Sequence, residues 1–250
     1  MPHADHLVLR NVWVASFVLS LSLLGDALLY VILPVHADAF GVSLAMVGFL
    51  LAINRIIRTF AYGFIADLAE RIRLKKLCLI AATTAVLSTL GYTLLNGAVW
   101  LSLSRVMWGL SYAALLLITF SYAAINPQKT GTRIGLSRSV EQIGPLFAMT
   151  VGAWLATLVG PKAVFGYLAI VSGLAVLLAF FLFEKAQPKT IKRPAKRDRL
   201  FPRPDSLDAL IFWMGAGIDG VFTLSIPLMW AQQGSMELAI LIGGGILAER

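Results

Sequence analysis

Long apolar stretches, interrupted by short polar segments, run through most of this 250-residue chain. A helix needs about 20 apolar residues to cross a bilayer. By that measure the pattern predicts seven membrane-spanning helices, near residues 12–35, 42–66, 77–96, 98–124, 139–160, 162–183 and 207–230. An eighth apolar stretch begins near residue 236 and has only about a dozen apolar residues before the chain ends, too few for a comfortable crossing. The pattern therefore predicts that the chain stops within a transmembrane element.

One long polar segment, residues 184–206, divides this pattern. It is basic and contains four prolines, so we expect little packed structure there. The predicted organisation is a six-helix bundle over 1–183, a basic cytoplasmic linker over 184–206, and the incomplete start of a second bundle over 207–250. The linker is interpreted as a solvated loop, with contact to anionic lipid headgroups as the alternative.

Composition supports a membrane protein. Hydrophobic residues make up 58% of the chain, charged residues only 14%, and the mean hydropathy is +0.81. Soluble domains are about half apolar and a quarter charged. The first apolar run is too long for a signal peptide, so we interpret it as a retained helix. The predicted fold class is an all-α polytopic transmembrane bundle, with the lipid bilayer as its first partner.

Basic residues show which side of the membrane each loop faces, because cytoplasmic loops are enriched in lysine and arginine. With a cytoplasmic N-terminus, the outer loops carry only Lys162. The cytoplasmic segments then carry sixteen basic residues, namely Arg10, Arg71, Arg73, Lys75, Lys76, Lys129, Arg133, Arg138, Lys185, Lys189, Lys192, Arg193, Lys196, Arg197, Arg199 and Arg203. The net charge of +8 therefore reflects membrane topology and does not indicate a nucleic-acid partner.

A short acidic motif occurs twice inside the apolar runs. Asp26 precedes Pro34 by eight residues, as Asp219 precedes Pro227 at an offset of 193. Further along, Gly48 and Arg55 recur as Gly243 and Arg250 at an offset of 195. Two segments repeated in the same order indicate duplicated halves, which is how many transporters are built. A carboxylate at membrane depth is expensive and indicates function.

Three charged residues of the first four spans lie at similar depth. At 1.5 Å per helical residue, Asp26, Arg55 and Arg105 fall within roughly 10 Å of one another along the membrane normal. Because an isolated buried charge is costly, we expect Asp26 to pair with Arg105 or Arg55. Three roles stay open for Asp26: a permanent ion pair, proton exchange and direct substrate contact. Asp219 has no evident partner in the sequence except Arg250, so its partner is otherwise expected on helices beyond the chain.

Four short motifs occur in order along the spans. Gly63, Asp67 and Arg71 follow the second span, with Leu68 and Glu70 at two positions where a basic residue and a glycine are usual. The other three motifs are Arg105 with Gly109 in span four, Gly144-Pro145 in span five, and Gly25-Asp26 with Leu33-Pro34 in span one. Together they resemble the signatures of the major facilitator superfamily, and of its drug and metabolite exporters in particular.

The resemblance implies a fold and a function. A full member has twelve spans in two bundles, so this chain corresponds to one bundle and the opening of the second. It is expected to be a truncated form or to need a partner that supplies the missing helices. The implied function is secondary transport of a small molecule by alternating access, with proton-coupled efflux by an antiporter of the bacterial inner membrane. Gly63, Asp67 and Arg71 would gate one face, and Gly144-Pro145 would kink a helix, either against leak or for packing.

Other classes of function fit less well. A membrane scaffold derived from a transporter is the alternative, favoured by Leu68, Glu70 and the abrupt end at Arg250; an inactive fragment is a further one. The sequence contains no glycine-rich phosphate loop and no catalytic constellation, so neither ATP-driven transport nor an enzyme is expected. The scattered histidines and the single cysteine, Cys78, indicate no metal site, and no cofactor is expected.

Overall fold

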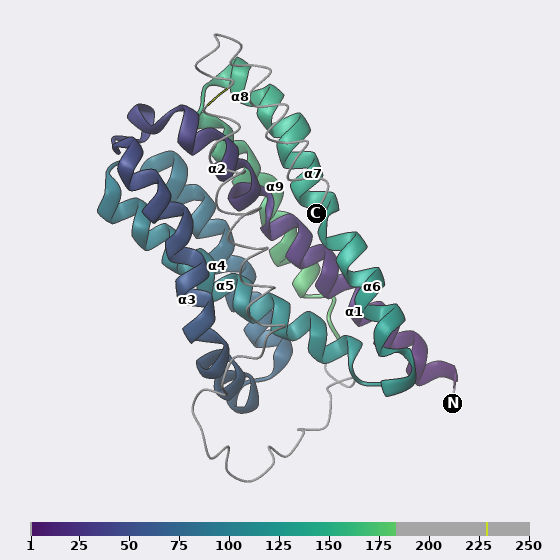
Figure 1. Ribbon diagram of the computed structural model, residues 1–250. Coiled ribbons are helices and arrows are strands. Elements are labelled where there is room, and N and C mark those ends of the chain that lie inside the picture. The colour runs from purple at the N-terminus through teal and green to yellow at the C-terminus, as the bar shows by residue number, and fades with distance from the viewer. Residues whose placement is uncertain (1, 184–228, 230–250) are drawn as a thin grey trace.

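The computed structural model describes residues 2–183 and Met229, and every regular element in that part of the chain is helical (Figure 1). The all-α fold class is therefore confirmed for the described residues. Apart from Met229, the linker and the predicted seventh and eighth spans lie outside them, and so do Asp219, Gly243 and Arg250. The division of the chain at residue 183 stays a prediction.

The first span is a helix with one break. Helix α1 (Pro2–Ser22) and helix α2 (Leu24–Val35) meet at Leu23, whose N–H lies 3.0 Å from the Leu19 oxygen and 3.2 Å from the Ser20 oxygen. The span is the most buried of the long apolar helices described, because α1 packs against α5, α6 and α9. It forms the centre of the bundle, so side chains on α2 are held on several sides.

The next three long helices follow one another through two short turns. The short 3-10 helix η1 (Ala37–Phe40) leads to α3 (Leu44–Arg71), α4 (Leu74–Leu94) and α5 (Ala98–Ala123). Helix α5 packs between α3 and α4. Its first turn follows Gly97, which has φ +89° and donates its N–H to the Phe40 oxygen at 2.9 Å. This bond joins the two loops at one end of the bundle.

The fifth span is divided into several helical pieces. They are η2 (Pro127–Lys129), α6 (Thr130–Glu141), α7 (Ile143–Phe147), a π-helical turn η3 (Ala148–Gly152) and α8 (Ala153–Val159). Helix α9 (Ala163–Ala179) closes the described part and packs on α1 and α4. Within residues 2–183, five helices are long and apolar enough to cross a membrane, whereas α9, with 17 residues, is shorter.

The predicted boundaries of three spans are wrong. The helix of the first span begins at Pro2, ten residues before the predicted start. The fifth span begins before residue 139, so Arg133 and Arg138 lie on α6 and not in a loop. The second span continues past residue 66, so Asp67 and Arg71 lie on the last turns of α3. These extensions are polar, so they lack the apolar signal that defined the spans.

The helices of the first and fifth spans are longer than the hydrocarbon core is thick. Helices Asp5–Val35 and Pro127–Val159 have 31 and 33 residues. They are therefore about 47 and 50 Å long, whereas the hydrocarbon core is about 30 Å thick. The two lie side by side along the bundle (Figure 1). At their ends Asp5 accepts hydrogen bonds from Lys129 at 2.6 Å and from Arg133, which ties the polar start of α6 to α1.

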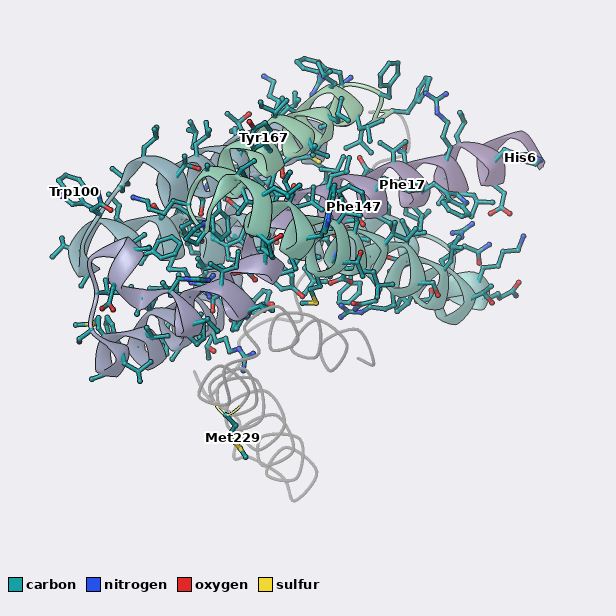
Figure 2. The ribbon with its side chains drawn as sticks, turned by 90° about the horizontal axis from the view of Figure 1, so that it is seen from above. His6, Phe17, Trp100, Phe147, Tyr167 and Met229 are labelled. Carbon is teal, nitrogen blue, oxygen red and sulfur yellow. The ribbon has the colours of Figure 1, made fainter. Side chains whose placement is uncertain are left out.

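The two ends of the bundle differ in their surface residues. Figure 2 places Trp100, at the start of α5, at one end of the described bundle and His6, near the start of α1, at the opposite end. Trp100 is largely exposed, as expected of an aromatic anchor at a membrane interface. Near the other end Asn11 exchanges two hydrogen bonds with the backbone of Phe183, at 3.0 and 3.1 Å.

Candidate functional site

A cavity of about 470 Å³ opens between α2, α3, α5 and the fifth span. Its lining is half polar and contains both acids and arginines. The lining residues are Leu23, Asp26, Ala27, Tyr30, Arg55, Arg58, Thr59, Tyr62, Tyr112, Glu141, Gln142, Pro145 and Met149. The volume is in the range of small-molecule binding sites.

Asp26 lies in the first turn of α2, where it is buried against α5. Its Oδ1 accepts a hydrogen bond from Nη1 of Arg105, with which it forms an ion pair. The same oxygen lies 3.4 Å from Nδ2 of Asn54 on α3. Arg105, one of the two partners expected from depth, thus pairs with Asp26.

Arg105 is fully buried and has partners besides the acid. Its Nε donates to the Leu50 oxygen at 3.0 Å, and its Nη2 lies 3.4 Å from the Leu51 oxygen. Nη2 also donates to the hydroxyl of Tyr30 at 3.2 Å. The guanidinium therefore joins α2, α3 and α5 through directed donors, a geometry that arginine provides and lysine does not.

Gly109 explains how Arg105 reaches the backbone of α3. A Cβ atom at Gly109 would lie 2.9 Å from the backbone oxygen of Asn54. The absence of a side chain lets α5 approach α3 closely, one turn away from the arginine. Arg105 is the buried cation, and Gly109, four residues later, allows the close approach of α5 to α3 that brings Arg105 within reach of the α3 backbone.

One face of α3 supplies a wall of the cavity. Arg55 and Arg58 lie one turn apart, so their side chains share a helix face. The guanidinium carbon of Arg55 lies 5.6 Å from the ring centre of Tyr30, and that of Arg58 lies 4.4 Å from the ring centre of Tyr112. Both distances are in the range of cation–π contacts. Both arginines thus line the cavity.

Glu141 is a second buried acid in the same cavity, and sequence reasoning missed it as a site residue. Its Oε2 pairs with Nη1 of Arg138 at 2.7 Å, and its Oε1 accepts from the hydroxyl of Tyr112 at 3.3 Å. Glu141 is the last residue of α6, which begins at Thr130, so it lies within the fifth span and not at the start of it. The i, i+3 spacing of Arg138 and Glu141 is the signal that indicates this pair.

Gly144 forms a close contact between the fifth span and the first. Its N–H donates to the hydroxyl of Ser20 at 2.8 Å, and a Cβ atom there would lie 1.9 Å from the Ser20 backbone oxygen. Pro145 lines the cavity, and the π-helical turn η3 begins three residues later. The structure thus shows a packing role for this pair of residues, and a role against leak stays a prediction.

The proposed gating residues lie apart from the cavity. Gly63, Asp67 and Arg71 are exposed near the end of α3 and are not among the lining residues. A Cβ atom at Gly63 would have nothing within 4 Å, unlike one at Gly109 or Gly144. In the described part of the chain, no group of three or more histidine, cysteine, aspartate or glutamate residues is placed to ligate a metal.

Comparison with known protein families identifies the chain. The family model described as Major Facilitator Superfamily matches residues 15–248, which is nearly the whole sequence. The chain belongs to the major facilitator superfamily. A comparison with curated proteins gave no match.

Membership of the major facilitator superfamily confirms the family inferred from the four motifs. The protein is an integral membrane protein of a transporter family, not of an enzyme family. The scaffold alternative is not favoured, since the match covers the cavity-forming spans and continues through Asp219. The cavity described above is therefore the candidate substrate site of a transporter.

Proposed function

We propose that this member of the major facilitator superfamily is a secondary active transporter that exports a small molecule by alternating access, coupled to protons through Asp26. The observation that carries the proposal is the ion pair of Asp26 and Arg105 at the wall of the cavity. A charged pair at membrane depth is expensive, so its placement beside a cavity indicates function.

The surroundings of Arg105 support proton exchange by Asp26. If Asp26 takes up a proton, Arg105 still donates to the Leu50 oxygen and to Tyr30. Protonation would therefore break the ion pair between α2 and α5 while Arg105 keeps these neutral partners. This loss of the ion pair is the step that would couple proton binding to helix movement.

Sequence features support the proposed direction of transport and the proposed orientation of the protein in the membrane. The motifs around Asp26 and Gly144 resemble those of exporters, and antiport with protons follows from that resemblance. Basic residues concentrated on one side favour a cytoplasmic N-terminus in a bacterial inner membrane. Asp219, outside the described residues, is proposed as the equivalent acid of the second half, and Gly63, Asp67 and Arg71 as a gate on the cytoplasmic face.

The test uses the purified full chain in liposomes with an imposed pH gradient and a panel of substrates. We expect substrate export to be accompanied by proton uptake, and we expect Asp26→Asn to abolish the proton flux. Lys76→Gln, which removes an exposed charge outside the cavity, serves as the control. Undiminished proton flux in Asp26→Asn would rule out coupling through this acid.

A further inference from the structure

The charges around the cavity are unbalanced. Two carboxylates line it, those of Asp26 and Glu141, and each forms an ion pair with an arginine, Arg105 and Arg138. Arg55 and Arg58 add two more positive charges to the lining. Among the described residues, four arginines thus face or flank the cavity against two acids.

Hydrogen bonds make the acids still less available to a cationic ligand. Oδ1 of Asp26 is approached by Asn54 as well as by Arg105, and Glu141 accepts from Tyr112 as well as from Arg138. A cation in the cavity would have to displace these donors, and it would meet the guanidinium groups on α3. An anion would add the missing negative charge, and a cavity with one sign of charge attracts the opposite sign.

The rest of the lining is suited to an apolar body. The lining includes the rings of three tyrosines and apolar side chains, namely Tyr30, Tyr62, Tyr112, Leu23 and Met149. Arg58 lies over the ring of Tyr112, so its guanidinium is held at the surface of the cavity beside an aromatic face. Such a lining can take an aromatic or aliphatic group while the guanidinium binds a carboxylate or phosphate by its paired N–H donors.

We propose that the ligand of this cavity is an amphiphilic organic anion, a carboxylate or phosphate on an apolar body, with Arg58 as its anion-binding side chain. The inference rests on the proposed function, because it names the substrate class of the same site. It separates this transporter from exporters of cationic compounds.

The experiment compares three probes of the same shape. Radiolabelled 2-naphthoate, 2-naphthamide and 2-naphthylmethylammonium are bound to the purified full chain in neutral detergent by equilibrium dialysis, with protein-free micelles as the baseline. We expect naphthoate to bind at least about tenfold more tightly than the ammonium compound, with the amide between them. Naphthoate binding no tighter than ammonium binding, including no binding of either, would overturn the proposal.

Variants locate the anion contact. Arg58→Gln should weaken naphthoate binding by about tenfold and leave naphthamide binding unchanged, and Arg58→Lys should restore part of the lost affinity. Lys76→Gln, at the exposed start of α4, removes the same charge elsewhere and should have no effect. Equal weakening of all three probes in a folded Arg58→Gln protein would assign Arg58 a structural role and overturn its assignment.

Transport measurements distinguish failure of the proposed transport function from failure of the proposed anion site. If naphthoate binds selectively but no probe crosses liposomes under a pH gradient of either direction, the anion site stands and the transport function fails. If only the ammonium compound is transported, the transport function stands and the anion inference fails.

Discussion

The cavity holds two acid–arginine pairs, and they are built differently. Asp26 and Arg105 come from different helices, α2 and α5, and Arg105 is fully buried. Arg138 and Glu141 lie one turn apart on the same helix, and the Arg138 side chain is 45% exposed. The first pair therefore depends on how helices pack, whereas the second depends on one helix turn.

The difference indicates which pair can report on conformation. Moving α2 away from α5 separates Asp26 from Arg105, but no relative movement of whole helices separates Arg138 from Glu141. A two-state element whose balance depends on ligands is what coupling requires. Of the two pairs, the inter-helix pair is the one that such a movement would separate, which supports the proton coupling proposed for Asp26.

The largest effect is expected at the inter-helix pair of Asp26 and Arg105. Arg105→Ala leaves the Asp26 carboxylate buried without its cation, so the free energy of unfolding should fall by about 3–5 kcal/mol. Unfolding of the purified protein in mixed detergent micelles measures it. Adding Asp26→Asn should recover part of the loss, because no buried charge is then left over. A loss no larger than that of Arg138→Ala would remove the distinction between the pairs.

The second prediction concerns the contact that holds the two pairs in one cavity. Gly144→Ala places a methyl group against the Ser20 backbone and separates the helix of Glu141 from that of Asp26. Overpacking of this kind lowers stability by about 1–3 kcal/mol. Gly135→Ala, on the same span with nothing within 4 Å of its Cβ position, is the matched control. Equal melting temperatures for the two variants would contradict the close contact.

The smallest effect is expected at the pair of Arg138 and Glu141, which lies within one helix. Arg138→Ala should change the free energy of unfolding by less than about 1 kcal/mol, because the pair is partly screened by solvent. Tyr112 still donates to Glu141 in that variant. Combined with Tyr112→Phe, the loss should exceed the sum of the two single losses, since Glu141 then has neither donor. An additive double-mutant cycle would show that the two donors act independently.

The sequence predicted the parts of the fold that apolar patterning controls. Five of the six spans predicted within residues 1–183 have helices long enough to cross a membrane, and the sixth corresponds to the shorter α9. The ion pair of Asp26 was predicted from depth alone, because a charge buried in lipid needs a partner at its own level. The family was predicted from four partial motifs and confirmed.

The sequence did not predict two kinds of feature. These are the contacts that depend on which face each helix presents to its neighbours, and the helices that continue into polar sequence. Residues 130–139 are polar, so the helix that carries Arg138 and Glu141 gave no hydrophobic signal. Arg58 and Tyr112 lie on different spans, and their contact requires knowing which face each helix presents. The roles of Asp67, Arg71 and Asp219 stay predictions.

The π-helical turn η3 has a consequence for changes in chain length. A π-turn accommodates one residue more than an α-helix does while the faces on either side stay aligned. Deleting one residue from Ala148–Gly152 should therefore convert the turn to α-helix and leave both flanks facing as before. The same deletion between Arg133 and Arg138 would rotate one flank by about 100° relative to the other. Natural length variation in this span is thus expected within the π-turn.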